Sequence, residues 1–313
     1  MSITVAIILF AVGVFLVAKG GDWFVDAASW IARAANISPL IIGATIVSFA
    51  TTLPELIVSL MASLEGKNDM AVGNAVGSVT ANTGLIMAAA FIFMSVTVSR
   101  KDCLKQCLLL LAAGGVLWLG SAGGRLALWA SIVLFGIFLC FMVINVISAK
   151  REKEETVQKL PVTGKDTAKN IIKFIVGALL IVLGSNLLIR GGSSIAERLG
   201  VPERVIAVTM VAIGTSLPEL VTTITAIRKK ESQLSVGNII GANIIDLTMI
   251  LPVCSFAAGD SFAVSAQCLR IDLPACLLLS LIAVVPLIIK ERSYKLQGGL
   301  LLALYAAYIV ITV

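Results

Sequence analysis

The chain has 313 residues, of which 58% are hydrophobic and only 13% are charged, and its mean hydropathy is +1.03. Soluble domains are nearer half apolar and a quarter charged, so this composition excludes an ordinary soluble protein. The formal net charge is +6, but most basic residues stand in short connectors between apolar blocks. That placement argues against nucleic-acid binding and agrees with orientation in a membrane.

The apolar blocks are long enough to cross a bilayer, which takes about 20 residues. We expect ten transmembrane helices, at about 2–33, 39–63, 69–95, 104–120, 126–148, 171–197, 202–227, 234–257, 268–289 and 296–313. The first and the sixth exceed one bilayer thickness, which predicts that they are tilted or broken. The predicted fold class is an all-α integral membrane protein.

Two stretches of the chain recur at a spacing of 164 residues without a gap. Residues 51–56 (TTLPEL) align with 215–220 (TSLPEL), and residues 73–82 (GNAVGSVTAN) align with 237–246 (GNIIGANIID). Because each half holds five predicted spans, the second half enters the membrane from the opposite side. The sequence therefore predicts two inverted five-helix repeats, an architecture found in many secondary transporters.

The only long polar stretch runs from Lys150 to about Asn170. We interpret it as a linker, which gives a first repeat at 1–148, a cytoplasmic linker at 149–170 and a second repeat at 171–313. Lys and Arg concentrate in this linker and in the connectors that follow the other odd-numbered spans. The positive-inside rule then places these connectors in the cytoplasm and both termini outside the plasma membrane.

Three carboxylates, Glu55, Glu219 and Asp246, lie inside apolar blocks, several residues from the ends of their spans. A charged side chain at the bilayer centre costs about 3 kcal/mol or more. Pairing with Lys19 or Arg190 would offset that cost, but the recurrence of the acids in both repeats favours a function. We therefore take the three acids as candidate site residues.

Pro54 and Pro218 each precede one of the glutamates in mid-span. Proline has no N–H, so the carbonyl four residues earlier, at Ala50 or Gly214, loses its helix bond and needs another partner at membrane depth. The hydroxyls beside these carbonyls belong to Thr51, Thr52, Thr215 and Ser216. Carboxylate, hydroxyl and carbonyl oxygens suit hard cations such as Ca²⁺ or Na⁺, and the chain has no histidine for softer metals.

The next span of each half adds polar residues four apart, which lie on one helical face. They are Ser78 and Asn82 in the first half, and Ala242 and Asp246 in the second. Glycines with the same spacing, at 73 and 77 and at 237 and 241, predict a smooth face for close helix packing.

These paired motifs resemble the signature of the cation/calcium antiporter superfamily, in its sodium/calcium exchanger group, over nearly the whole chain. The resemblance implies that Glu55 and Glu219 coordinate the cation and that Asn82 and Asp246 are the central Asn/Asp pair. It also implies coordinating hydroxyls and carbonyls at Thr51, Thr52, Thr215 and Ser216, with Ser48, Ala212 and Ser78 along the ion path. The chain departs from the signature at Ala50, Val79, Thr80 and Ala242, which bears on Na⁺ sites more than on Ca²⁺ binding.

The function expected from the resemblance is exchange of Ca²⁺ for Na⁺ by alternating access. We expect a transporter and not an enzyme, with no cofactor. Its expected partners are the lipid bilayer and the transported Ca²⁺ and Na⁺, and the sequence does not predict an oligomeric state. Coupling to H⁺ or K⁺ remains an alternative, because carboxylates bind protons as readily as Na⁺. An intramembrane acid hydrolase is disfavoured because it needs two aspartates that share a proton. A passive channel would leave the inverted duplication unexplained.

Overall fold

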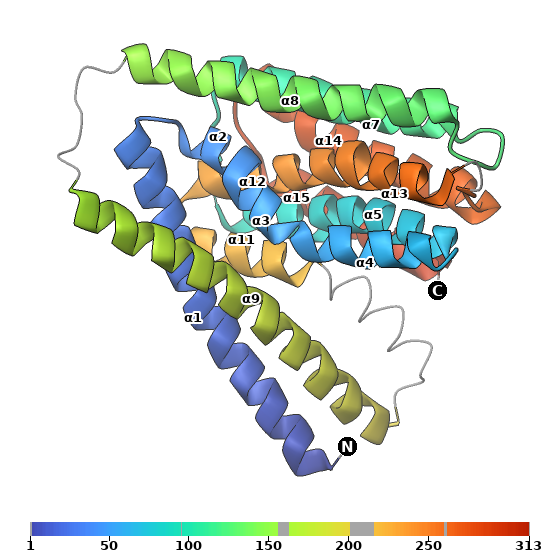
Figure 1. The fold of residues 1–313 in the computed structure, drawn as a ribbon, viewed down its shortest axis with the longest axis horizontal. Helices are drawn as coiled ribbons and strands as arrows, with labels where there is room; N and C mark the ends of the chain where they lie inside the picture. Colours follow the sequence, from blue (N-terminus) through green and yellow to red (C-terminus); the bar gives the residue numbers. More distant parts are fainter. Residues whose placement is uncertain (1, 95, 156–162, 201–215, 260–261, 313) are drawn as a thin grey trace.

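The computed structural model describes residues 2–94, 96–155, 163–200, 216–259 and 262–312, which are almost entirely helical (Figure 1). Within these ranges, eight helical segments are long and apolar enough to cross a membrane, and a ninth candidate is a bent pair of helices. The predicted all-α membrane class is confirmed. The predicted span 202–227 begins at residues outside the described ranges.

The boundaries of the central elements repeat at the spacing seen in the sequence. In the first half these elements are α4 (Leu53–Leu64), α5 (Asn68–Ala81) and the π-helical η2 (Asn82–Met87). Their counterparts are α11 (Leu217–Lys229), α12 (Ser232–Ile245) and the π-helical η3 (Asp246–Ile250). Each counterpart begins 164 residues later. The two motifs are therefore alike in local structure as well as in sequence.

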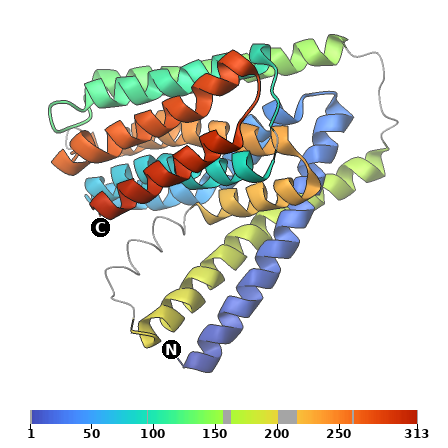
Figure 2. The same cartoon turned by 180° about the vertical axis from the view of Figure 1, so that it is seen from behind.

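The longest helices are α1 (Ile3–Ala35) and α9 (Gly164–Arg198), of 33 and 35 residues. At 1.5 Å per residue each is about 50 Å long, well beyond one bilayer thickness. Both helices are continuous. Of the two predicted ways to fit the bilayer, tilting or breaking, the structure therefore excludes breaking. Figures 1 and 2 show the two helices side by side, running in opposite directions and inclined to the rest of the bundle.

Glycines allow α1 and α9 to approach closely. A Cβ on Gly13 would lie 2.9 Å from the carbonyl oxygen of Gly184, and one on Gly20 would lie 2.8 Å from the carbonyl oxygen of Gly177. At the 164-residue spacing, Gly13 corresponds to Gly177 and Gly20 to Gly184. The contact between Gly13 and Gly184 therefore corresponds to the contact between Gly177 and Gly20. This is the pattern expected when two antiparallel helices are related by a two-fold axis.

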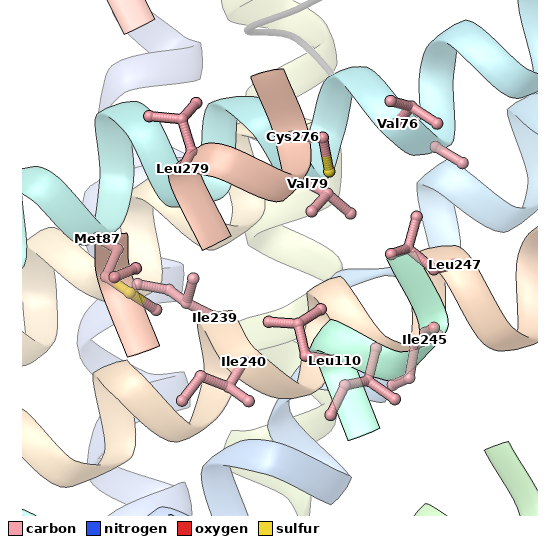
Figure 3. Packing of buried hydrophobic residues seen from close by; sticks show 14 of the residues in the cluster. Val76, Val79, Met87, Leu110, Ile239, Ile240, Ile245, Leu247, Cys276 and Leu279 are labelled. Carbon is pink, nitrogen blue, oxygen red and sulfur yellow. The ribbon is translucent and has the colours of Figure 1, made fainter. Parts of the chain in front are cut away.

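The hydrophobic core is centred on two spans that the other helices surround, Asn68–Phe93 and Ser232–Ala258. In the most apolar 18 residues of these two spans, 72% and 89% of the residues are buried. In the other six unbent candidates among the described residues, the share is 44% or less. The first ends in α6 (Ala88–Phe93) and the second in α13 (Leu251–Ala258). Figure 3 shows Val76, Val79, Ile239 and Ile240 among the apolar side chains that pack there.

Two glycines of the second motif hold α12 against α2 (Pro39–Ile42) and η1 (Gly43–Val47). A Cβ on Gly237 would collide with the carbonyl oxygen of Leu40, and one on Gly241 with that of Ala44. The predicted close-packing face is confirmed for this half. It is not seen in the first half, where a Cβ on Gly73 or Gly77 would meet no atom of the described residues within 4 Å. The face on α12 joins the two halves of the chain, because α2 and η1 precede the first motif.

The remaining spans are α7 (Arg100–Gly120), α8 (Leu128–Glu155), α14 (Leu273–Lys290) with its π-helical start η5 (Cys268–Asp272), and α15 (Lys295–Thr312). Helix α8 continues into the stretch interpreted as linker, and α9 begins there, at Gly164. Thr163 caps α9 by accepting a hydrogen bond from the backbone N–H of Asp166 at 3.2 Å. Good helix formers and this cap extend helix into both ends of the polar stretch.

Candidate cation-binding site

The second predicted span is bent by 45° where the first motif begins. Helix α3 (Ser48–Thr51) ends before Thr52, and α4 starts with Pro54 and Glu55 in its first turn. Helix α11 starts in the same way, with Ser216 as N-cap and Pro218 and Glu219 in its first turn. Broken helices with free terminal groups are a recurring way to build ion sites inside membranes. The predicted site residues Thr215 and Ala212 lie outside the described ranges.

Asn82 and Asp246 occupy equivalent positions at the start of η2 and η3, where the α-helix widens into a π-helix. The sequence pattern did not predict these π-helical turns. Such turns are rare and occur frequently at functional sites, because the extra residue redirects the side chains around it. The central Asn/Asp pair therefore sits at a local distortion that both halves share.

Packing between the halves brings the acidic elements together. Helix α4 lies against η3 of the second half, and α11 lies against η2 of the first half. Glu55 comes close enough to Glu219 and to Asp246 for their charges to interact, and Glu219 and Asp246 interact likewise. The three predicted acids therefore form one electrostatic cluster built from both repeats.

The acids of this cluster are buried and unpaired. Glu55 is 1% exposed, and Glu219 and Asp246 are 0% exposed. No hydrogen bond of normal geometry reaches any of their six carboxylate oxygens in the described part of the chain, although the Thr51 hydroxyl lies near Glu219, and Oδ1 of Asn82 and Oγ of Ser216 also have no partner there. Burying a charged group without a partner is strongly unfavourable, so these oxygens require a cation or a proton.

The pairing alternative is not seen in the structure. Lys19 is exposed on α1 and its Nζ lies over the ring of Trp23, 5.4 Å from the ring centre. Arg190 is exposed on α9. Neither cation neutralises the buried acids.

Hydroxyl groups near the helix break use their protons on backbone and amide oxygens. Ser48 Oγ donates to the carbonyl of Thr45 at 3.1 Å, and Thr52 Oγ1 donates to the carbonyl of Ser48. Thr51 Oγ1 lies 3.2 Å from both the Ser48 carbonyl and Oδ1 of Asn238. A hydroxyl that donates its one proton to such an acceptor keeps its oxygen lone pairs available to a cation. Ser78, the remaining predicted residue, is also buried.

The sequence interpretation missed buried asparagines that organise the site. Asn74 Nδ2 donates to Ser59 Oγ at 2.9 Å and to the carbonyl of Glu55 at 3.3 Å. Asn243 Nδ2 donates to Thr83 Oγ1 at 2.8 Å and so joins the two halves. The repeated Gly-Asn pairs, at 73–74 and 237–238, were a sequence signal that could have identified Asn74 and Asn238.

Carboxylates alone do not make the site. Within the described residues, no three or more Cys, Asp or Glu side chains are grouped closely enough to hold one metal ion. In this arrangement of the described residues, a cation would use at most two of the carboxylates together with neutral oxygens. Ca²⁺ accepts such mixed ligand sets, because it takes six to eight oxygens from carboxylates, carbonyls and amides.

Comparison with known proteins gives consistent results. The family model described as sodium/calcium exchanger protein matches residues 5–147 and 169–313. The chain is 28% identical over 348 residues to the sodium/calcium exchanger MaX1 of Methanosarcina acetivorans, with 99% of each chain covered. It is 35% identical over 254 residues to the inner membrane protein YrbG of Escherichia coli, covering 78% of this chain and 77% of that one.

A solved structure has the same fold. The sodium-calcium exchanger NCX_Mj superposes with a TM-score of 0.85 at 27% identity, and 99% of each chain is covered. Together the helical bundle, the buried acids and these matches define a membrane transporter of the cation antiporter class and not an enzyme. The chain belongs to the sodium/calcium exchanger family.

Proposed function

We propose that this protein exchanges Ca²⁺ for Na⁺ across the plasma membrane by alternating access. The cations would bind at mid-membrane to Glu55, Glu219, Asn82, Asp246 and the adjacent hydroxyl and carbonyl oxygens. The observation that carries the proposal is the set of six buried carboxylate oxygens that no hydrogen bond of normal geometry reaches in the described residues. Such a cluster is stable only when cations or protons neutralise it.

Charge counting explains why the two cations would exchange. With all three acids ionised the cluster carries a charge of −3, which three Na⁺ neutralise. One Ca²⁺ leaves a charge of −1, which a proton on Asp246 removes. The empty cluster is too costly to carry across the membrane, so competition for shared oxygens couples the two flows.

The architecture proposed for this exchange is ten helices in two inverted five-helix repeats. The support is the shared element boundaries, the antiparallel course of α1 and α9, and the exchanged glycine contacts between them. Helices α1 and α9, which cross the bundle obliquely, are the elements that would move relative to the site.

The coupling ion is tested by Ca²⁺ uptake into vesicles that contain the purified protein. Na⁺, K⁺ and H⁺ gradients are imposed separately, and uptake is followed with a Ca²⁺-sensitive dye. We expect an outward Na⁺ gradient to drive uptake many-fold above the gradient-free control. Uptake driven by H⁺ or K⁺ alone would favour the alternative coupling in the same fold.

The proposed orientation places both termini outside and the 149–170 stretch in the cytoplasm. Contacts between connectors agree with the relative sides: Thr97 pairs with Arg292, and Arg125 pairs with Ala263, each joining two connectors that the prediction places together. We predict that Lys67→Cys reacts with an impermeant thiol reagent in whole cells, whereas Lys165→Cys does not. Both are tested with the native cysteines removed, and equal labelling contradicts this orientation.

Asp246 differs in charge from its counterpart Asn82, and this difference predicts a specific variant. We expect Asp246→Asn to retain Ca²⁺ binding within about tenfold, because the amide mimics the protonated acid and both glutamates remain. The pH dependence of exchange should flatten, because the variant lacks the carboxylate that the charge count assigns to the proton. Radioactive Ca²⁺ binding and exchange at several pH values check this. Loss of binding as complete as in Glu219→Gln would make Asp246 a direct Ca²⁺ ligand and not the protonated acid of the Ca²⁺-bound state.

A further inference from the structure

Ion pairs tie α1 to the C-terminal end of α11 and to Glu231, which follows that helix. Lys229 Nζ lies 2.6 Å from Oδ1 of Asp26 and 3.7 Å from Oδ1 of Asp22, and it donates to the Asp22 carbonyl at 3.1 Å. Arg33 Nη1 lies 3.5 Å from Oε1 of Glu231. We call this set, with Arg228 at 3.8 Å from Asp22, the α1–α11 latch.

The repeat relation maps the two closest ion pairs of this latch onto a second set of charged residues, whereas Asp22 and Arg228 correspond to the uncharged Asn186 and Leu64. At the 164-residue spacing Asp26 corresponds to Arg190 on α9, and Lys229 corresponds to Glu65 at the end of α4. Both charges are reversed, so the equivalent pair is again attractive.

The second ion pair behaves in the same way. Arg33 corresponds to Glu197 on α9, and Glu231 corresponds to Lys67 after α4. Again both signs are reversed and the attraction is kept. We call Glu65, Lys67, Arg190 and Glu197 the α9–α4 set. Reversal of both partners in two separate pairs keeps complementarity across the repeat, although the individual residues differ.

The α9–α4 set is open in this structure. Glu65 Oε2 pairs with Lys67 Nζ at 2.7 Å within the same connector, which holds the pKa of Glu65 below its usual value. Arg190 and Glu197 form no ion pair within the described part of the chain. Helices α1 and α9 both pack against α11, and within that part neither packs comparably against α4. The structure therefore shows one side latched and the equivalent side unlatched.

We propose that these two sets are reciprocal latches: the α1–α11 latch closes one side of the transporter, and Arg190–Glu65 and Glu197–Lys67 close the other side in the alternate state. The proposal rests on the alternating access of the proposed function. The ion pairs are partly exposed, so they add little to overall stability. They matter because small differences in contacts are enough to shift an equilibrium between two conformations.

The first test asks whether the unseen pairs form. Glu65→Cys and Arg190→Cys are combined in a variant without the six native cysteines, and the protein is oxidised with copper phenanthroline in vesicles. The control pair combines Glu65→Cys with Leu183→Cys, an exposed position about two turns earlier on α9. We expect cross-linking of the first pair at least fivefold above the control pair.

The second test asks whether the two latches compete. Adding Lys229→Asp places a third acid beside Asp22 and Asp26, and we expect it to raise the Glu65–Arg190 cross-linking rate at least threefold. Adding Asp26→Lys as well restores an attractive pair and should return the rate toward the parent value. Lys230→Asp makes the same charge change on an adjacent exposed residue and should leave the rate unchanged.

The outcomes distinguish a failure of the reciprocal-latch proposal from a failure of the proposed Ca²⁺/Na⁺ exchange. Cross-linking no greater than in the control pair, or equal effects of Lys229→Asp and Lys230→Asp, overturns the reciprocal latch. If the cysteine-free parent meanwhile shows Na⁺-driven Ca²⁺ uptake, the proposed function stands without it. Cross-linking that responds as expected, in a protein that moves no Ca²⁺, keeps the latch and overturns the proposed cargo.

Discussion

Glu55→Gln and Glu219→Gln are each expected to abolish Ca²⁺ exchange, with rates at least a hundredfold below the parent, while the protein remains folded. Both side chains are fully buried in the first turn of a helix that restarts at a proline, and no hydrogen bond of normal geometry reaches either carboxylate in the described residues. The amide keeps the shape but removes the charge that holds the cation. Ca²⁺ uptake into vesicles measures the loss.

A matched control is Glu65→Gln, which makes the same change on an exposed connector. It should keep substantial exchange, although a shift in rate is compatible with its place in the α9–α4 set. Gel filtration in detergent shows whether each variant is folded. Near-normal exchange by either buried variant would remove that glutamate from the site.

Gly237→Leu is expected to prevent assembly of the bundle. A side chain at this position would collide with the backbone of Leu40, and backbone yields less readily than a flexible side chain. Overpacking a core costs about 1–3 kcal/mol when side chains give way, and more is expected here. We predict that the variant aggregates or unfolds at a markedly lower temperature in detergent.

Gly299→Leu is the matched control for this packing effect. A Cβ on Gly299 would meet no atom of the described residues within 4 Å, and Gly299 is exposed on α15. It should unfold at nearly the temperature of the parent. Equal thermal stability of the Gly237 and Gly299 variants would show that α12 does not depend on close approach to α2.

The helical membrane fold and the residues of the candidate site were predictable from residue pattern. Acids inside apolar blocks identified Glu55, Glu219 and Asp246, and Pro54 identified the place where the second span bends. These features depend on single residue types whose physical cost at that depth is large. The 164-residue repeat added the correspondence between helices, because a duplicated segment repeats its local structure.

Other features depend on tertiary contacts that no local pattern encodes. The π-helical turns at Asn82 and Asp246 insert one residue into a helix, and their register is decided by neighbouring helices. The bond between Thr51 and Asn238 joins residues 187 positions apart. The latch pairs likewise combine elements that are distant in sequence, so their meaning appears only once α1 is seen beside α11.

Equilibrium binding of radioactive Ca²⁺ to the purified protein, with Na⁺ as competitor, tests the shared site most directly. The account predicts that Na⁺ displaces bound Ca²⁺ completely and competitively, and that Glu55→Gln and Glu219→Gln each lower Ca²⁺ affinity at least a hundredfold. Full-strength Ca²⁺ binding in both variants, or Ca²⁺ that Na⁺ does not displace, would contradict a common site built from these buried carboxylates.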